Sequence, residues 1–341
     1  MSRIGILLVN LGTPNSQDPG DVRKYLTQFL TDGRVIDTPW LSRQFLVRGI
    51  IVPKRYKESA ANYSRIWTEM GSPLLYHGER VRDLLRNQVG EEFQVELAMR
   101  YQQPSIETVL DRMRDCHEMI ILPLFPQYAS ATTGSVHQEV MRVISGWLTI
   151  PELQFVNSYP THPKMIEAFC ELGKQFSIDE YDHILFSFHG LPERHLRNAD
   201  RNDHCLKQKG CCQNLNRKNQ LCYSAQCHAT GQEIAKGIGV NEKKYTICFQ
   251  SRLGKDPWVR PYTSDMLDEL LQQGKKKILV FSPAFVCDCL ETIDEIGNEY
   301  RAEFLSKGGE KLDLVPGLND HPLWIEALQD LVLSKVTAKA V

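Results

Sequence analysis

The stretch Asp182-His-Ile-Leu-Phe-Ser-Phe-His-Gly-Leu-Pro192 decides how the second half of this chain is organised. Its apolar run, residues 184–188, contains β-branched and aromatic side chains and predicts a short buried strand. Gly190 and Pro192 end that strand, so His189 is left at its carboxyl end. Ligands of open α/β sheets bind at this edge, where a histidine can ligate a metal or move a proton near neutral pH. A histidine that only hydrogen-bonds within a loop fits the same stretch, which by itself leaves both interpretations open.

The composition indicates a globular chain of two domains. Of the 341 residues, 42% are hydrophobic, which is enough for sizeable cores. Lys and Arg total 40 against 42 for Asp and Glu, and a net charge of −2 gives no general electrostatic reason to bind nucleic acid or an anionic membrane. The apolar runs are too short to cross a bilayer and no clear signal peptide is present, so we expect a cytoplasmic protein. Its ten cysteines are then expected to stay thiols or to bind metal.

Strands alternate with helices along the sequence, which predicts parallel sheets built from βαβ units. The two halves also repeat each other, because His162-Pro-Lys-Met-Ile-Glu-Ala168 recurs as His321-Pro-Leu-Trp-Ile-Glu-Ala327. We therefore expect an α/β fold of two similar Rossmann-like lobes, each a four-stranded parallel sheet flanked by helices, with the ligand cleft between them. The expected lobes span residues 1–160 and 161–320, and the last helix, residues 321–336, could pack on the first lobe.

Carboxylates follow a second strand of the same lobe as His189. Asp288 and Glu291 come after the predicted strand at residues 278–281, so they should lie at the same sheet edge as the histidine. They are three positions apart and share a face at a helix start. A histidine facing two carboxylates can hold a divalent metal or pass protons in relay. The alternative for Glu291 is a first-turn carboxylate that only interacts with the helix macrodipole.

One segment near the amino terminus, residues 40–51, interleaves large apolar side chains with basic ones. It contains Leu41 and Phe45 together with Arg43 and Arg48. The simpler interpretation is an amphipathic helix that packs on the core. The other is an exposed apolar surface, called the lip here, that receives a hydrophobic substrate or contacts a membrane surface. In the second case the segment would be a peripheral membrane contact. The sequence leaves both interpretations open.

Six motifs that occur together in this chain resemble those of the ferrochelatase family, the terminal enzymes of haem synthesis. The motifs span nearly the whole sequence: Leu7-Leu-Val-Asn-Leu-Gly-Thr-Pro14, Phe125-Pro-Gln-Tyr-Ala-Ser-Ala-Thr-Thr-Gly134, Ser187-Phe-His-Gly-Leu-Pro192, Phe249-Gln-Ser-Arg252, Pro257-Trp258 and Phe285-Val-Cys-Asp-Cys-Leu-Glu-Thr292. The resemblance implies a chelatase-like fold and insertion of Fe²⁺ into protoporphyrin IX to form protohaem, with release of two protons. Porphyrin and Fe²⁺ would be the substrates.

The resemblance also implies roles for single residues. His189 matches the active-site histidine of the family and Glu291 its active-site glutamate, and both are expected to meet the incoming Fe²⁺. Asp288 is expected to act with them, and Phe285 matches a residue that lines the same pocket. The further residues expected to contact the substrate are Tyr128, Arg100 and Trp258, together with Leu41 and Phe45 of the lip.

Two other functions remain open at this point. The closest alternative among enzymes is a chelatase for another tetrapyrrole or metal, such as coproporphyrin III or cobalt. A porphyrin or haem carrier would need the apolar pocket, but it has no need of both His189 and the acidic series Asp288, Glu291 and Glu295. Their joint presence therefore favours an enzyme. The oligomeric state is not predicted by the sequence.

The chain departs from the family pattern in one place. After the His-Gly-Leu-Pro segment the family reaches a Gly-Asp-x-Tyr element, whereas this chain has a polar insertion, residues 193–228, with five cysteines within 23 positions. Four thiolates suit a structural zinc or an iron–sulfur cluster, and spacing alone does not choose between them. Because some ferrochelatases carry a [2Fe–2S] cluster, the resemblance favours that cofactor over zinc. The expected ligands are Cys205, Cys212, Cys222 and Cys227, with Cys211 as an alternative to Cys212.

Overall fold

The computed structural model describes residues 3–252, 254 and 256–337, and these divide into two compact units. The first unit comprises residues 3–125, 129–157 and 325–337, and the second comprises residues 126–128 and 158–324. Across the described residues, no helix is both long enough and apolar enough to cross a bilayer.

The first unit contains a four-stranded sheet in which every strand pair is parallel. Its strands, in the spatial order β2-β1-β3-β4, are β1 (Arg3–Gly12), β2 (Phe93–Tyr101), β3 (Cys116–Pro123) and β4 (Glu152–Phe155). Its helices are α1 (Pro19–Leu30), α2 (Trp40–Phe45), η1 (Leu46–Ile51), α3 (Val52–Ile66), α4 (Pro73–Val89), α5 (Ile106–Arg112), η2 (Ser130–Gly134) and α6 (Ser135–Ile144), and α12 (Pro322–Thr337) belongs to this unit from Ile325 onward.

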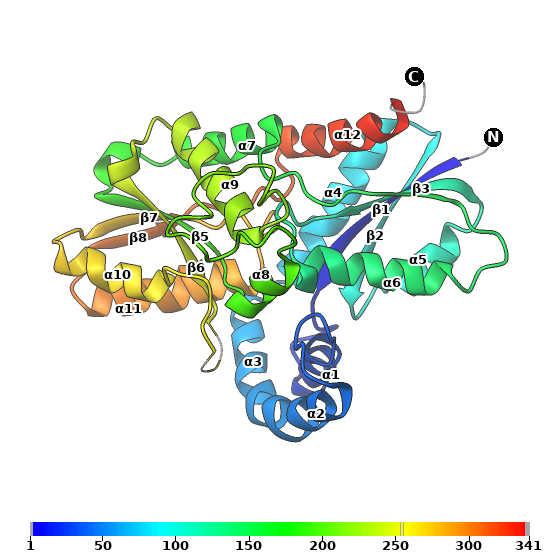
Figure 1. Cartoon of the computed structure of the whole chain (residues 1–341), viewed down its shortest axis with the longest axis horizontal. Helices are drawn as coiled ribbons and strands as arrows, with labels where there is room; N and C mark the ends of the chain where they lie inside the picture. The colour runs from blue at the N-terminus through cyan, green and yellow to red at the C-terminus, as the bar shows by residue number, and fades with distance from the viewer. Residues whose placement is uncertain (1–2, 253, 255, 338–341) are drawn as a thin grey trace. The chain divides into compact units, whose positions relative to one another are not determined.

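The central strands β1 and β3 of the first sheet are buried on both faces, which explains why their sequences are continuous apolar runs. Leu7 and Val9 of β1 pack with α5 and α6 on one face of the sheet. Ile6 and Leu8 are equally buried and point to the other face, because side chains alternate along a strand. Figure 1 shows the helices α5 and α6 on one side of β1–β3 and α4 on the other.

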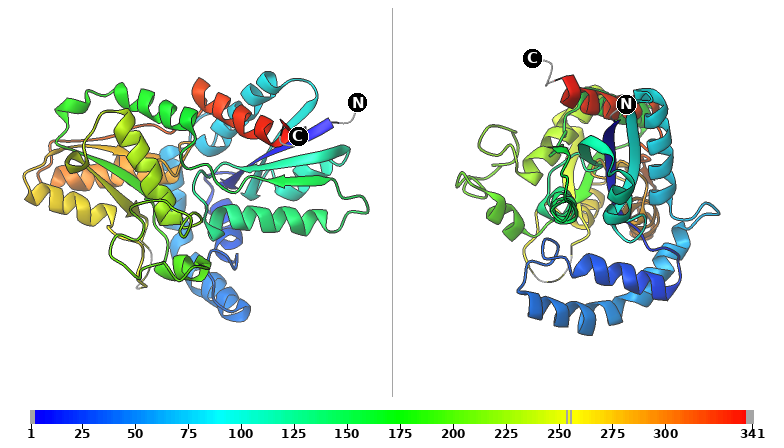
Figure 2. Two further views of the ribbon diagram at one scale, coloured as in Figure 1. Left: turned by 45° about the horizontal axis from the view of Figure 1, so that its top comes forward. Right: turned by 90° about the vertical axis from the view of Figure 1, so that its right-hand side faces the viewer.

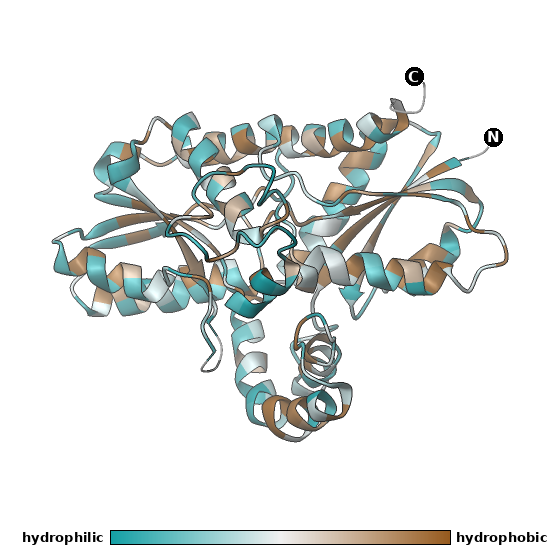
Figure 3. Cartoon of the chain, viewed as in Figure 1, coloured by the Kyte–Doolittle hydropathy of each residue, from teal (hydrophilic) through white to brown (hydrophobic). Residues whose placement is uncertain are grey.

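A separate helical layer, formed by α1, α2, η1 and α3, has a small core of its own. Leu30, Val47 and Val52 are buried there among half-buried side chains of α1 and η1. In both views of Figure 2 these helices lie together, outside the two layers that cover the sheet. Figure 3 shows hydrophobic residues on α2 that are not part of either sheet layer.

The second unit repeats the architecture of the first. Its parallel strands, in the spatial order β6-β5-β7-β8, are β5 (His183–His189), β6 (Tyr245–Gln250), β7 (Lys277–Phe281) and β8 (Lys311–Leu314). Its helices are α7 (Pro163–Lys174), η3 (Ile178–Glu180), α8 (Glu193–Ala199), α9 (Tyr223–Gly237), η4 (Glu242–Lys244), α10 (Thr263–Gln272), the π-helix η5 (Leu290–Tyr300) and α11 (Arg301–Ser306). The matching strand orders confirm the predicted pair of four-stranded parallel sheets.

The core of the second unit positions the carboxyl ends of β5, β6 and β7. Leu185, Ile278 and Val280 pack against α10, η5 and α11 on one face of the sheet, and α7 and α9 cover the other (Figure 1). Strand β5 lies in the centre, paired with β6 and β7. Because the three strands are parallel, the residues that follow them gather at one edge of the sheet.

Candidate active site

His189 is the last residue of β5 and pairs in register with Gln250 of β6. The Nδ1 atom of its ring lies 2.7 Å from the carbonyl oxygen of Gly190. A carbonyl can only accept, so Nδ1 carries the proton and donates it. This tautomer leaves Nε2 with a free lone pair. The half-buried imidazole is therefore oriented by the backbone and presents an acceptor nitrogen, the form that a general base requires.

Two aromatic side chains stand beside the His189 ring. The ring centroid of Trp258 lies 6.4 Å from that of His189, and the centroid of Phe285 lies 6.3 Å from it in an edge-on arrangement. Gly190 permits this close approach, because a Cβ atom there would lie 2.7 Å from the carbonyl oxygen of Gln250 and 3.1 Å from the Trp258 ring. The histidine therefore has an apolar wall on two sides.

Glu295 faces the same sheet edge from η5. Its Oε2 atom accepts hydrogen bonds from the Ser251 hydroxyl at 2.6 Å and from the Gln250 amide at 3.2 Å, and its Oε1 atom accepts one from the Tyr300 hydroxyl at 3.2 Å. Burial raises the pKa of the Glu295 carboxyl, and the charge of Glu291 raises it further. The hydrogen bond from Ser251 and the positive form of His189 act in the opposite direction. The carboxyl group can therefore exchange a proton closer to neutral pH than an ordinary glutamate.

Glu291 lies in the first turn of η5, and its carbonyl oxygen accepts a hydrogen bond from the Gln250 amide at 3.0 Å. The thiol of Cys289, which is buried, donates to the Glu291 carboxylate, and burial raises the pKa of that thiol. The structure thus places Trp258 and Phe285 beside His189, and Gln250, the strand partner of His189, contacts Glu291. It also adds Gln250, Ser251 and Tyr300, to which the sequence assigns no role, although Gln250 and Ser251 belong to the motif at residues 249–252 and lie at the end of β6.

Asp288 precedes η5, and its carboxylate accepts three hydrogen bonds within the protein. Its Oδ1 atom accepts hydrogen bonds from the Gly317 backbone at 3.0 Å and from the Thr292 hydroxyl at 3.1 Å. Its Oδ2 atom accepts one from the Asn319 amide at 2.8 Å. These contacts tie the start of η5 to the loop after β8. Asp288 therefore holds the π-helix in place in this structure.

Tyr128 and Arg100 are positioned by different networks. The backbone N–H of Tyr128 donates to the side chain of Gln226 at 2.7 Å, and its ring is half-buried. In the first unit, the Arg100 guanidinium pairs with Asp32 at 2.8 Å and donates to the Ser135 hydroxyl at 2.7 Å. The Ser135 hydroxyl in turn donates to Asp32 at 2.5 Å. Arg100 thus joins the end of β2 to the segment after α1 and to the start of α6.

The predicted lip is exposed. Leu41 is 75% exposed and Phe45 is 72% exposed, and Trp40 beside them is 63% exposed. The segment is anchored from behind by Arg43, whose guanidinium donates to the carbonyl oxygens of Thr31 and Thr38 at 2.9 and 2.7 Å. The same segment also contacts a core, because Val47 is buried and Ile51 packs beside it, so only part of residues 40–51 is left exposed.

The cysteine-rich insertion brings several sulfur atoms together between α8 and α9. The Sγ atom of Cys212 lies 3.5 Å from that of Cys211 and 3.9 Å from that of Cys222. Thiolates that share a tetrahedral metal with bonds of about 2.3 Å have sulfurs about 3.8 Å apart, so these separations fit metal ligands. The loop is held by Asp200, whose carboxylate accepts from the backbone N–H groups of His204 at 2.6 Å and Cys205 at 2.7 Å.

The insertion nevertheless holds no complete metal site. Among the described residues, no group of three or more His, Cys, Asp or Glu side chains has a geometry that could hold a metal ion. Cys227 lies inside α9 rather than in the loop, and its side chain is completely buried beside Tyr223. All ten cysteines lie among the described residues and are free thiols.

Solved structures with a similar fold are metal chelatases. SirB from Bacillus subtilis with Fe³⁺ matches with a TM-score of 0.50 and 14% identity, over 97% of this chain and 94% of that chain. The sirohydrochlorin chelatase SirB from Bacillus subtilis subspecies spizizenii in complex with cobalt matches with a TM-score of 0.50 and 13% identity, over 96% and 93%. The fold is therefore the two-lobed fold of the chelatases.

Sequence comparison identifies the family within that class. The ferrochelatase family profile matches residues 3–336. A ferrochelatase of Legionella pneumophila is 44% identical over 97% of this chain and 98% of its own length, and one of Ectopseudomonas mendocina is 42% identical over 97% and 98%. One of Coxiella burnetii is 41% identical over 96% and 92%. The chain belongs to the ferrochelatase family and is a metal chelatase of haem synthesis.

Proposed function

We propose that this ferrochelatase inserts Fe²⁺ into protoporphyrin IX to form protohaem, with release of two protons, and that His189 and Glu291 carry the reaction. The observation that supports this most is the His189 ring: its Nδ1 is committed to the Gly190 carbonyl, so Nε2 is available as a base beside two glutamates. A carrier has no use for such an oriented base. The whole-length similarity to ferrochelatases supports the same choice.

The reaction needs two pyrrole N–H protons to leave before both nitrogens can bind iron. In this proposal the Nε2 atom of His189 accepts a pyrrole proton. Glu295, whose raised pKa suits proton exchange near neutral pH, would pass protons away from the ring, and Glu291 lies one turn earlier on the same helix, where it could meet the metal or a proton. Asp288 would support them by fixing the start of η5.

The apolar residues would bury the macrocycle. Trp258 and Phe285 flank the base and would contact the ring edge, and Tyr128 would contribute from the same unit. For Arg100, the ion pair with Asp32 favours a positioning role at the end of β2. Leu41 and Phe45 would receive the porphyrin at the lip, because their exposed side chains offer apolar area that the fold itself does not use.

The same lip would serve as a peripheral membrane contact. Protoporphyrin is apolar and partitions into lipid, so an enzyme that receives it benefits from an apolar helix at the bilayer surface. Trp40, Leu41 and Phe45 expose such an edge. A chain that touches the membrane only in this way would otherwise reside in the cytoplasm, which agrees with the ten free thiols.

A [2Fe–2S] cluster in the insertion completes the proposal. The 3.9 Å separation of the Cys212 and Cys222 sulfurs suits two thiolates that bind the same metal ion. The loop is polar and has little core of its own, so a bound centre would supply the cross-link that orders it. Cys205, Cys212, Cys222 and Cys227 remain the proposed ligands, with Cys211 as the alternative. A structural zinc would use the same thiolates.

Anaerobic metal-insertion assays test the substrate directly. The purified chain should insert Fe²⁺ into protoporphyrin IX with a higher kcat/KM than into coproporphyrin III, measured by the absorbance of the metallated product. A preference for coproporphyrin III would contradict protoporphyrin IX as the substrate, but it would still support metal insertion as the reaction. Tight porphyrin binding without turnover would contradict the enzyme and support a carrier.

A further inference from the structure

A pocket of about 670 Å³ opens on the helical layer of the first unit, between α1 and the junction of η1 with α3. Its lining is basic and polar: Arg23, Lys24, Arg48, Thr27, Gln28 and Thr31, with Gly20 and Val52. It shares no residue with the candidate active site. The surrounding charges and the apolar edge of α2 indicate what this pocket could hold.

The cations of the pocket are largely uncompensated. Lys24 pairs with Asp21 at 2.9 Å, but the part of the chain that the structure describes places no carboxylate in an ion pair with Arg23 or Arg48. Arg23 lies over the Tyr56 ring at 5.8 Å, and Arg48 donates to the neutral side chain of Gln44 at 2.8 Å. Guanidinium groups with free N–H donors beside threonine and glutamine side chains form a site suited to a phosphate.

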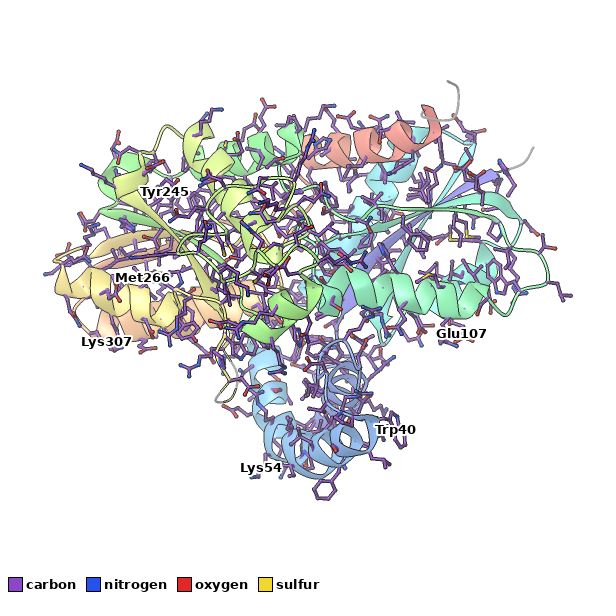
Figure 4. The ribbon with its side chains drawn as sticks, in the orientation of Figure 1. Trp40, Lys54, Glu107, Tyr245, Met266 and Lys307 are labelled. Atoms are coloured by element: carbon purple, nitrogen blue, oxygen red, sulfur yellow. The ribbon has the colours of Figure 1, made fainter. Side chains whose placement is uncertain are left out.

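The chain around the pocket is basic although the whole protein is not. Residues 40–57 contain Arg43, Arg48, Lys54, Arg55 and Lys57 and no Asp or Glu, in a protein whose net charge is −2. Arg43 is used internally, and the other four side chains are exposed. Figure 4 labels one apolar and one cationic residue of this segment, Trp40 of α2 and Lys54 of α3.

Arg48 connects the pocket to the apolar edge. It lies three positions after Phe45, and residues with this spacing are neighbours on a helix surface. Gly49 places only a hydrogen beside the Phe45 ring, so the junction between α2 and η1 stays open. An apolar edge flanked by unpaired cations is the arrangement that anionic bilayers bind, because the apolar groups enter the interface while the cations meet headgroup phosphates.

We propose that the pocket formed by Arg23, Lys24 and Arg48 binds the phosphate of an anionic phospholipid headgroup while Trp40, Leu41 and Phe45 enter the bilayer. This inference rests on the proposed membrane contact of the lip and gives that contact its lipid class. Binding should be selective for anionic lipid, and it should weaken with salt because the cations are exposed.

Vesicle co-sedimentation of the full chain tests this with four proteins. They are wild type, the pocket variant Arg23→Gln/Lys24→Gln/Arg48→Gln, the lip variant Leu41→Ser/Phe45→Ser, and a control that neutralises three exposed lysines elsewhere, Lys236→Gln/Lys243→Gln/Lys276→Gln. Vesicles are phosphatidylcholine alone, or phosphatidylcholine with a third replaced by phosphatidylglycerol. Each cation near an anionic surface contributes about fivefold, so the pocket variant should lose at least about tenfold in binding to phosphatidylglycerol vesicles. The control should keep its binding to within about twofold.

The outcomes separate the inference from the contact on which it rests. Equal binding to both vesicles, or a pocket variant that behaves like the control, overturns the headgroup site and keeps the membrane contact. No binding to any vesicle overturns both, and a dimer that the lip variant abolishes would then explain the apolar edge. Calorimetric binding of inorganic phosphate or glycerol 3-phosphate as tight as vesicle binding would make this a site for free phosphate and overturn the lipid assignment. Loss of the anionic preference in the pocket variant, with an unchanged melting temperature, supports it.

Discussion

The hydroxyl of Ser251 donates a 2.6 Å hydrogen bond to the Oε2 atom of Glu295, and this contact joins the end of β6 to η5. Ser251 makes it from a left-handed backbone conformation, with φ of 64°, which residues other than glycine seldom adopt. The contact fixes one oxygen of a carboxyl group whose pKa is raised mainly by burial. A carboxyl group held in this way can exchange protons without changing its position.

The raised pKa of Glu295 predicts how stability depends on pH. The folded state holds the proton more tightly than the unfolded state, so the charged carboxylate lowers stability above the folded pKa. That loss disappears as the pH falls towards the ordinary glutamate value of about 4.3. Glu295→Gln should therefore melt above wild type near about pH 8 and lose this advantage near about pH 4.5. Thermal melts at both pH values check this, and an advantage of the same size at both would contradict the assignment.

Glu291→Gln should lower turnover while porphyrin binding is retained. If Glu291 handles protons or metal, the rate should fall by about 100-fold, since a positioned acid or base contributes about this much. A carboxylate that only meets the helix macrodipole would instead contribute about 0.3–1 kcal/mol of stability and leave turnover unchanged. Rate and porphyrin affinity are measured on one preparation. Glu299→Gln, on the exposed side of the same helix, is the matched control.

The lip should matter for substrate capture and not for folding. Leu41→Asp/Phe45→Asp should raise the porphyrin KM several-fold, because both side chains are exposed and add apolar area. Exposed substitutions usually change the free energy of unfolding by less than about 0.5 kcal/mol, so the melt should hardly move. Leu148→Asp/Ile150→Asp changes two exposed apolar residues elsewhere in the first unit and serves as control. An equal rise in KM for both double variants would contradict the proposal that Leu41 and Phe45 receive the porphyrin.

The insertion should carry a redox-active metal centre. Protein purified without oxygen should be red-brown and contain roughly two irons and two acid-labile sulfides per chain. Cys222→Ser should lose the colour. Cys170→Ser, which changes a buried thiol outside the insertion, should keep it. Comparing Cys211→Ser with Cys212→Ser identifies which of these two adjacent thiols is the ligand. Colourless protein with one tightly held zinc would contradict the [2Fe–2S] cluster, but it would still support a metal site in the insertion.

Much of the architecture could be predicted from the sequence because local patterns determine it. The apolar runs at residues 184–188 and 278–281 lie in the two central strands of a parallel sheet. The repeated His-Pro segments correctly indicated two units of the same topology. The sheet edge that collects the ends of β5 and β6 brought His189 and Gln250 together, as parallel pairing requires. Leu41 and Phe45 are exposed, and their role as a substrate lip stays a prediction.

Other features depend on tertiary contacts that leave no local signal. Asp288 looks like any acidic residue in the sequence, yet its carboxylate is committed to Asn319, thirty-one positions away along the chain. Glu295 gains its raised pKa from burial in the folded state. The sequence places Cys227 in one cluster with the other four cysteines, and its burial within α9, which begins at Tyr223, leaves no local signal.

The rate of Fe²⁺ insertion by His189→Ala tests the central claim most directly. His189 lies beyond the buried run of β5, so its removal should leave the melting temperature within a few degrees of wild type. Because the oriented Nε2 atom is the proposed base, turnover under anaerobic conditions should fall by about 100-fold or more while porphyrin still binds. His117→Ala, which removes an exposed histidine, should retain the wild-type rate. A His189→Ala protein that keeps more than about a tenth of the wild-type rate would contradict this account.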